Sequence, residues 1–396
     1  LHLSSPMQFS SIIGQKETIA QLRSMVEQSR LSHALLFLGK EGTGALPLAI
    51  AFAQYLVCEK VQGPAVEKKE DPHFPADSCG ICHSCVTAAQ LIHPDIHFSF
   101  PVIPSKPGDK PISNDYLTEW REFIGQFPYG NIFDWLQFIG AENKQGNITA
   151  NECADIMRKL SLKSFESGYK ILVMWMPEYL RGEGNKLLKL IEEPPEKTLF
   201  LLVAEEESTM LPTILSRTQL VKIPPIDTTD MERALIKRAG VPPEKARPLS
   251  SLAEGNYREA LFLLQHDEED WQALVRDWLN AILKSGPVAQ VKWVDEISKL
   301  GREKQKQFLR YFNHLLEESI RMRVMGASAP EIPENERDFA IRLNKLATLS
   351  QQQAIIEEID RAAYYIERNA HGKMLFQALS IKLYHIIKDN SLILMH

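Results

Sequence analysis

The 396-residue sequence contains no apolar run that approaches the roughly 18 residues needed for a membrane-spanning helix. Its N-terminal stretch, LHLSSPMQFS, has neither the basic nor the apolar segment of a secretory signal, and Met7 is a candidate for the natural start. Basic residues are not in excess, because the sequence has 45 Lys and Arg against 51 Asp and Glu, which gives a net charge of −6. These absences favour a cytoplasmic protein without a membrane segment, and they argue against strong sequence-independent binding of nucleic acid by this chain alone.

Cysteine is also scarce, but four of the five cysteines lie in one neighbourhood: Cys58, Cys79, Cys82 and Cys85, the last three in the run CGICHSC. In a cytosolic chain such clustering favours a metal over disulfides. Four thiolates match a closed structural Zn²⁺ site, which is our prediction. An iron–sulfur cluster is one alternative, although its pattern needs a further cysteine shortly downstream, followed by proline. Free thiols are the other alternative.

Short apolar runs alternate with amphipathic segments over the first 225 or so residues. Because the runs are almost continuously apolar, they predict an α/β fold with a parallel sheet covered on both faces. The predicted strands are residues 33–38, 95–103, 169–175, 198–204 and 219–224.

Several segments depart from this alternation. Residues 59–78 are charged and contain proline, and we expect a surface excursion there. Residues 104–150 are rich in Pro, Gly, Asn and aromatic residues, and they indicate an insertion that contains a helix, to which the sequence assigns no function. Residues 227–268 predict short helices. From residue 271 to the end, apolar residues recur at helical spacing, which predicts a helical bundle.

The stretch GKEGTGAL, residues 39–46, follows a predicted strand and precedes a predicted helix, as in a phosphate-binding loop. Gly39, Gly42 and Gly44 stand where such a loop needs glycine. Ala45 replaces the lysine that neutralises phosphate charge, and Leu46 replaces the Ser or Thr that holds Mg²⁺. The loop therefore predicts loss of ATP hydrolysis, and it could equally be a glycine turn that only packs the helix on the sheet.

The acidic residues of the second ATPase motif are also missing. The strand KILVMW ends in Trp175 and continues with Met176, where an Asp for Mg²⁺ and a Glu for water are needed. Two separate losses of the same chemistry favour a chain that does not hydrolyse ATP. Two arginines also stand out, Arg217 in LSRTQ, just before the last predicted strand, and Arg258 in GNYREA; taken alone, each is most simply a solvated surface residue.

The order of these features resembles the AAA+ clamp-loader family of bacterial DNA polymerase III. The matching pieces are FSSIIGQKETIAQL, SHALLFLGKEGTG, the Cys58 and CGICHSC cluster, HPDIH, NKLLKLIEEPPEKTLFLLVAEE and LPTILSRTQ. The resemblance implies an AAA+ core over residues 7–226, with a zinc module at about 58–93 and the insertion at about 104–150. It also implies a small helical lid at 227–268 and a helical collar for oligomerisation at 271–396.

Within that family, the losses at the phosphate loop and at Trp175 and Met176 favour a delta-prime-like subunit, which is not an enzyme on its own and binds no ATP. The resemblance implies that Arg217 is an arginine finger, which completes the ATP site of a neighbouring subunit. Arg258 takes the sensor-2 position. The implied partners are the gamma/tau and delta subunits, the sliding clamp and primed DNA within the assembly.

Two other functions stay open at this point. One is a catalytically active, gamma/tau-like AAA+ ATPase that uses an unconventional site. The other is a zinc-dependent redox protein or metalloenzyme, which would need an open metal position, whereas four cysteines fill the coordination sphere.

Overall fold

The computed structural model of the chain describes residues 7–62, 75–104, 106, 108–141, 144, 146–265, 270–326, 334–367 and 370–389. Most of the predicted excursion at 59–78, residues 266–268 of the predicted lid, and residues 390–396 of the predicted collar lie outside this described part. The chain divides into two compact units, residues 1–265 and 266–396. Among the described residues, no helix combines the length and the apolar character needed to cross a bilayer.

A five-stranded sheet forms the centre of the first unit, in the order β2-β3-β4-β1-β5, with every neighbouring pair parallel. Parallel strands covered on both faces are apolar along their whole length, which is why the sequence runs identified them. The prediction of a parallel α/β sheet is confirmed. The strands are β1 (Ala34–Leu38), β2 (Ile96–Ser99), β3 (Lys170–Trp175), β4 (Thr198–Ala204) and β5 (Gln219–Lys222).

The second predicted strand was too long. Residues 95–103 were expected to be extended in the sheet, but β2 ends at Ser99. Pro101 has no N–H to donate to a neighbouring strand. Val102 instead forms an isolated antiparallel bridge with Asn147, with two N–H···O distances of 3.0 Å. This bridge joins the two ends of the predicted insertion.

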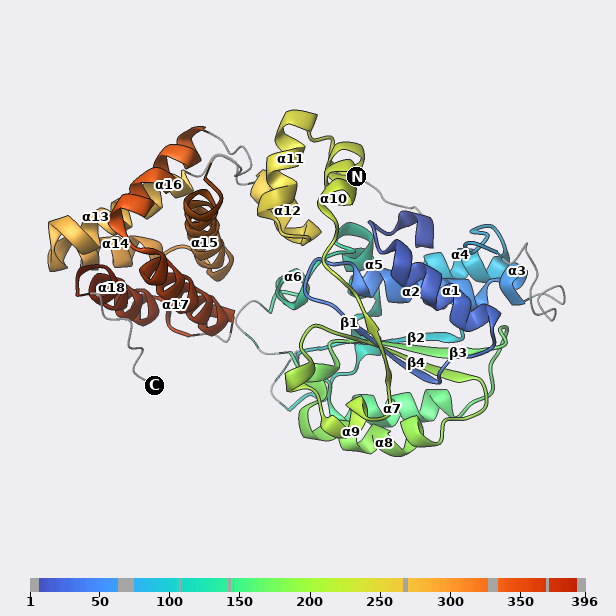
Figure 1. Cartoon of the computed structure of the whole chain (residues 1–396). Coiled ribbons are helices and arrows are strands. Elements are labelled where there is room, and N and C mark those ends of the chain that lie inside the picture. Colours follow the sequence, from blue (N-terminus) through green and yellow to red (C-terminus); the bar gives the residue numbers. More distant parts are fainter. Residues whose placement is uncertain are drawn as a thin grey trace. The chain divides into compact units, whose positions relative to one another are not determined.

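Helices cover both faces of the sheet, as Figure 1 shows. On one face, alternate strand residues pack with α1, α2 and the helices of the insertion, while the opposite residues pack with α7, α8 and α9. The first face carries η1 (Phe9–Ser11), α1 (Lys16–Glu27), α2 (Ala45–Val57), α3 (Glu59–Gln62), α4 (His83–Ala89), η3 (Ser113–Tyr116), α5 (Leu117–Gln126) and α6 (Ile132–Phe138). The second carries α7 (Ala150–Leu160), η4 (Pro177–Gly184), α8 (Asn185–Glu192), η5 (Glu207–Thr209) and α9 (Pro212–Leu215).

A three-helix segment follows the last strand and has an apolar cluster of its own, which includes Met231, Leu235 and Tyr257. It consists of α10 (Thr228–Ala239), α11 (Pro243–Leu252) and α12 (Tyr257–Gln265). The cluster also contains Ile13 and Tyr129, from the N-terminal segment and the insertion. The three-helix segment is therefore packed against distant parts of the first unit.

Every described element of the second unit is helical. The indole rings of Trp278 and Trp293 stack at its centre with centroids 4.8 Å apart, and Trp278 Nε1 donates to Ser380 Oγ at 2.9 Å. The elements are α13 (Trp271–Asn280), the π-helical turn η6 (Ala281–Ser285), α14 (Pro287–Ile297), α15 (Arg302–Met325), α16 (Glu334–Leu346), α17 (Leu349–Glu367) and α18 (Gly372–Lys388).

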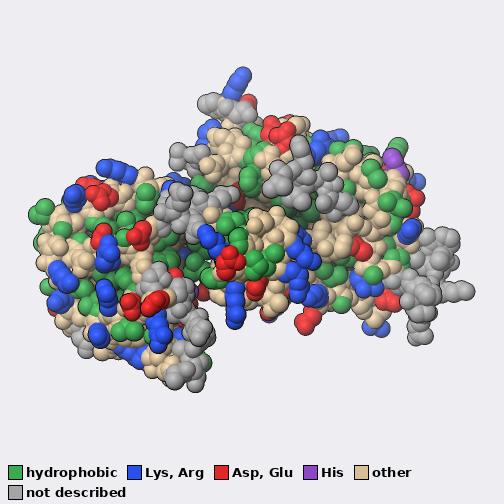
Figure 2. Space-filling view, turned by 90° about the horizontal axis from the view of Figure 1, so that it is seen from above, with side chains coloured by type: hydrophobic (Ala, Val, Ile, Leu, Met, Phe, Trp, Pro, Cys, Tyr) green, Lys and Arg blue, Asp and Glu red, His purple; other side chains and the backbone are tan. Residues whose placement is uncertain are grey.

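Acidic and basic side chains are interspersed on the face of the molecule shown in Figure 2. That pattern agrees with the net charge of −6.

Candidate functional site

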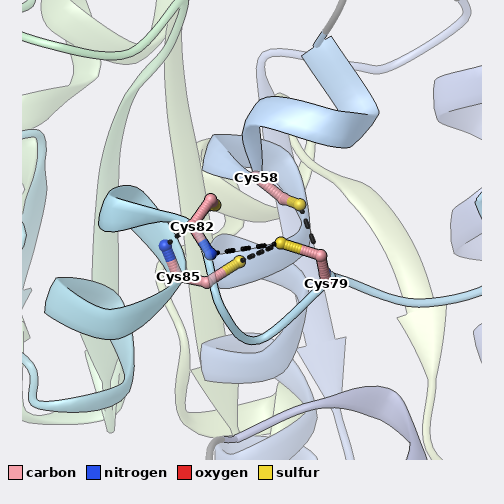
Figure 3. A group of neighbouring side chains, drawn as sticks. All are labelled: Cys58, Cys79, Cys82 and Cys85. Atoms are coloured by element: carbon pink, nitrogen blue, oxygen red, sulfur yellow. Dashed lines mark hydrogen bonds between the residues drawn. The ribbon is translucent and has the colours of Figure 1, made fainter.

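The four clustered cysteines converge, although 21 residues separate Cys58 from Cys79. Cys58 follows directly on α2, Cys82 is the N-cap residue of α4, and Cys85 lies in the first turn of that helix. Figure 3 shows the four side chains gathered between the end of α2 and the start of α4. Their sulfur atoms all lie within 4.8 Å of one another.

This arrangement fits a tetrahedral zinc ion. Zn–S bonds of about 2.3 Å place neighbouring sulfurs about 3.8 Å apart, and the sulfurs of Cys79 and Cys85 are 3.9 Å apart. The backbone N–H groups of Cys79, Cys82 and Cys85 donate to the sulfurs of Cys58, Cys79 and Cys82 at 3.3–3.4 Å. Backbone N–H groups that donate to sulfur stabilise the thiolate form that binds a metal.

One of the four thiols is prepared to lose its proton, whereas burial raises the pKa of Cys82 and the hydrogen bond to Cys58 raises the pKa of Cys85. A hydrogen bond from the Cys85 thiol lowers the pKa of Cys58 to about 4, against the opposing effect of burial. The ring Nε2 of His83, which lies within the run CGICHSC, is 3.7 Å from the Glu166 carboxylate. A bound zinc ion would join α2 to α4, and four sulfur ligands leave no open position for catalysis.

The glycine loop, residues 39–46, turns between β1 and α2 and ends in Ala45 and Leu46. Gly42 and Gly44 have φ of 69° and 92°, a region that favours glycine, and Gly44 caps the N-terminus of α2. Ala45 and Leu46 are 7% and 4% exposed and belong to the apolar core. The loop is held internally, since Thr43 Oγ1 donates to the Lys40 carbonyl at 2.7 Å.

No carboxylate stands at the end of β3 at the two positions that the sequence singled out. The Trp175 ring is buried, and its centroid lies 5.3 Å from that of Trp120 on α5. Met176 is also buried and has a positive φ of 58°. The next carboxylate, that of Glu178, accepts hydrogen bonds from the backbone N–H groups of Glu205 and Glu206 after β4, at 2.6 and 3.1 Å.

Arg217 lies just after α9, and its side chain is 34% exposed. Its Nε donates to Glu192 Oε1 at 2.5 Å, and its Nη1 donates to the Thr213 carbonyl at 2.8 Å and to Ser216 Oγ at 3.0 Å. The guanidinium is thus oriented by the ends of α8 and α9, with part of its surface open to solvent.

Arg258 is not the solvated helix residue that the sequence left open as an alternative. It is 8% exposed, and it forms two hydrogen bonds with the Asp134 carboxylate of the insertion, at 2.5 and 2.7 Å. Sequence reasoning missed Asp134. The signal that could have found it is the aromatic-rich run QFPYGNIFDWLQF, whose apolar character is too high for a solvated loop.

Among the predicted residues, the four cysteines come together, and Arg258 comes close to the glycine loop. Tyr257 N donates to the Gly42 carbonyl at 3.0 Å, and a Cβ built on Gly42 would lie 1.7 Å from Asn256 Oδ1. Arg217 makes its contacts elsewhere, with α8 and α9.

Comparison with known proteins gives a consistent result. The sequence profile of the family described as "DNA polymerase III, delta subunit" matches residues 14–227. The chain is 27% identical over 255 residues to DNA polymerase III subunit delta' of Bacillus subtilis, a match that covers 64% of this chain and 60% of that protein. It is 25% identical over 326 residues to DNA polymerase III subunit tau of the same organism, covering 79% of this chain and 47% of that protein.

The chain therefore spans about half to three fifths of the length of these two relatives. Among solved structures, a DNA polymerase III gamma subunit-related protein from Thermotoga maritima aligns with a TM-score of 0.34 and 14% identity. That alignment covers 93% of this chain and 99% of the other.

Proposed function

This chain belongs to the DNA polymerase III delta subunit family, whose profile matches residues 14–227, and from that premise we propose that it is a non-hydrolysing, delta-prime-like subunit of a clamp loader. In this role it helps to place a sliding clamp on primed DNA, together with gamma/tau and delta subunits. The AAA+ architecture, with a core, a helical lid and a helical collar, is part of the same proposal.

The observation that carries the proposal is the apolar packing of Ala45 and Leu46. In a hydrolysing loop these positions supply a lysine ammonium to the phosphates and a hydroxyl to Mg²⁺. Here both side chains are apolar and packed in the core, so neither supplies an ammonium or a hydroxyl group. Trp175 and Met176 add to this argument, since the end of β3 offers no carboxylate at those positions.

At these positions the chain therefore lacks the groups that bind the phosphates and Mg²⁺ of a nucleotide. We assign its catalytic contribution to Arg217 instead. A guanidinium that is oriented by Glu192 and Thr213, yet 34% exposed, suits a group that meets a phosphate on a neighbouring subunit. Arginine fingers contribute about 10³- to 10⁵-fold to the rate of hydrolysis. The subunit would then be inert by itself and necessary for its neighbour.

The zinc module has a structural role in this proposal. Four sulfur ligands would hold the end of α2 against α4 and keep the glycine-loop helix in place. A redox enzyme or metalloenzyme is disfavoured by the same donor set, since all four positions are filled by cysteine.

The test is reconstitution of the chain with gamma/tau and delta subunits, followed by single-turnover ATP hydrolysis in the presence of clamp and primed DNA. We expect Arg217→Ala to leave assembly unchanged and to slow hydrolysis roughly 10³-fold or more at the one site that it faces. Arg30→Ala, at an exposed arginine of the same unit, is the matched control and should hydrolyse at the wild-type rate.

Unchanged hydrolysis by the assembled Arg217→Ala complex would remove the finger from the proposal. A further outcome concerns the gamma/tau-like alternative. If the isolated chain binds Mg-ATP with micromolar affinity and turns it over, the chain is an active ATPase, and the delta-prime-like assignment is wrong.

A further inference from the structure

The insertion, which the sequence left without a function, is part of the core. Trp120 of α5 and Trp135 of α6 are 1% and 0% exposed, and their rings meet edge to face at 5.4 Å. Trp120 also stacks on Phe100 at 4.1 Å and contacts Trp175 at the end of β3. Large buried aromatic side chains dominate packing energies, so the insertion is fixed on the carboxyl end of the sheet.

The turn between α5 and α6 brings Tyr129 to the glycine loop. A Cβ built on Gly44 would lie 2.8 Å from Tyr129 Cε1. The Tyr129 hydroxyl accepts a hydrogen bond from Ile13 N at 2.9 Å, and its ring meets that of Tyr257 at 5.1 Å. Tyr129 is 6% exposed, so it fills the space between the N-terminal segment, the glycine loop and α12.

Polar side chains of the insertion bind the loop as well. Asn131 Nδ2 donates to Glu41 Oε2 at 2.7 Å, and Asn256 Nδ2 of the three-helix segment donates to Glu41 Oε1 at 3.3 Å. The glutamate that stands in the glycine loop is thus held from both sides. Its negative charge also opposes the approach of a phosphate.

Little space is left beside the loop. The cavity lined by Gly39, Gly44, Tyr129 and Trp175 has a volume of about 20 Å³. One or two water molecules fill such a volume, whereas small-molecule sites measure about 300–1,000 Å³. A nucleotide cannot enter while residues 128–131 keep their positions.

The Asp134–Arg258 pair completes the arrangement. A carboxylate and a phosphate each present two oxygen atoms that a guanidinium can bind through two parallel hydrogen bonds. Asp134 therefore gives Arg258 an anionic partner that belongs to the chain itself. Asn131 and Asp134 hold each other by reciprocal hydrogen bonds of 3.0 Å at the start of α6, which orients the carboxylate.

We propose that residues 128–134 are a built-in occupant of the degenerate nucleotide site: Tyr129 fills the space beside the glycine loop, and Asp134 binds Arg258 in place of a phosphate. The occupant fastens the three-helix segment to the sheet domain permanently, so the position of that segment does not respond to ATP. This inference deepens the proposed non-hydrolysing role, and its consequence for an assembled clamp loader rests on that proposed function. The contacts themselves belong to the isolated chain, where they are tested.

The first experiment is amide hydrogen exchange on the isolated full-length chain, read at residues 228–265. Asp134→Ala and Arg258→Ala should each accelerate exchange there by about 10-fold or more, since each removes the two hydrogen bonds that join the three-helix segment to the insertion. The double variant should be no faster than the single ones. Arg233→Ala is the control, because Arg233 pairs with Asp230 within α10, and it should exchange like the wild type.

Millimolar ATP should leave the wild-type exchange pattern unchanged. If ATP slows exchange at residues 228–265, or if the two single substitutions have additive effects, the fastening role is overturned. Because no partner subunit is present, this result is independent of the Arg217 hydrolysis experiment.

The second experiment restores the missing groups. Ala45→Lys with Leu46→Thr should not bind a fluorescent ATP analogue, because Tyr129 still fills the space. Adding Tyr129→Ala to those two substitutions should produce binding, with at least a 10-fold gain in affinity. Circular dichroism melts establish that each variant is folded. If the triple variant gains nothing over the double variant, Tyr129 is not what excludes the nucleotide, and the occupant proposal is wrong.

Discussion

Arg258 and Asp134 are joined by two hydrogen bonds of 2.5 and 2.7 Å across 124 residues of sequence. The arginine lies in the first turn of the last helix of the first unit, and the aspartate lies in the first turn of a seven-residue helix of the insertion. The pair therefore ties the insertion, to which the sequence assigned no function, to the three-helix segment that follows the sheet. It sets the first of the following predictions.

Arg258→Lys should destabilise the first unit by about 1–3 kcal/mol. Lysine keeps the positive charge but cannot make two parallel hydrogen bonds to the carboxylate. Urea unfolding followed by circular dichroism measures the loss. Arg233→Lys, at an exposed ion pair within one helix, should change the unfolding free energy by less than about 0.5 kcal/mol. Equal effects of the two substitutions would show that the fork geometry at Arg258 is unimportant.

Purified protein should contain about one zinc ion per chain. Cys58→Ser or Cys85→Ser should bring the zinc content close to zero and lower the melting temperature of the first unit, because metal binding energy is folding energy at such sites. Atomic emission spectroscopy and calorimetry provide the two measurements. Cys153→Ser is the control, since Cys153 lies on α7 outside the cluster, and it should retain the metal.

Stability should fall as the pH decreases from about 6.5 to about 4, in part because of His97. Burial, assisted by the positive charges of Lys159 and Lys170, lowers the pKa of His97 from 6.5 to about 4. Protons therefore bind the unfolded chain first, and the folded state loses roughly 2–3 kcal/mol across this window before the His97 contribution levels off below pH 4.

The check is the slope of unfolding free energy against pH for wild type and for His97→Gln. The substitution should make the slope shallower between pH 6.5 and 4. His371→Gln, at an exposed histidine, should leave the slope as it is. Parallel curves for wild type and His97→Gln would contradict the assignment.

Glu192→Gln should not slow the ATP hydrolysis of the reconstituted assembly. Arg217 must exchange its contact with Glu192 for a phosphate, and a partly exposed ion pair opposes this exchange by at most about 1 kcal/mol. Removing the charge should therefore raise the single-turnover rate, by up to about 5-fold. A loss of rate as large as that of Arg217→Ala would contradict this prediction, because it would mean that the orientation Arg217 gains from Glu192 outweighs the energy needed to leave that contact.

The strands and the cysteine cluster were predictable because their signals are local. Near-continuous apolar runs gave β3 and β4 within one residue at each end, since strands buried on both faces tolerate few polar residues. The spacing C-x₂-C-x₂-C brought three cysteines together, and the fourth, Cys58, was placed by the end of an adjacent helix.

The insertion shows where local signals stop. The sequence predicted one helix there, and the structure has α5 and α6 joined by the turn that carries Tyr129. Nothing in the spacing of Tyr129, Asn131 or Asp134 indicates contact with Gly44, Glu41 or Arg258, because such contacts depend on tertiary packing between residues 85 to 124 positions apart in the sequence. Only the density of aromatic residues hinted that the segment is buried.

The bridge between Val102 and Asn147 places the entrance and exit of the insertion side by side. The two ends of the insertion are therefore held together by the two hydrogen bonds of this bridge, so the insertion could be exchanged as a unit. Replacing residues 103–146 with a short Gly-Ser hairpin would keep β2 in register with β3 and remove the contacts of Tyr129 and Asn131 with the glycine loop. A different segment could also be inserted at the Val102–Asn147 bridge, with another side chain in the position that Tyr129 now holds.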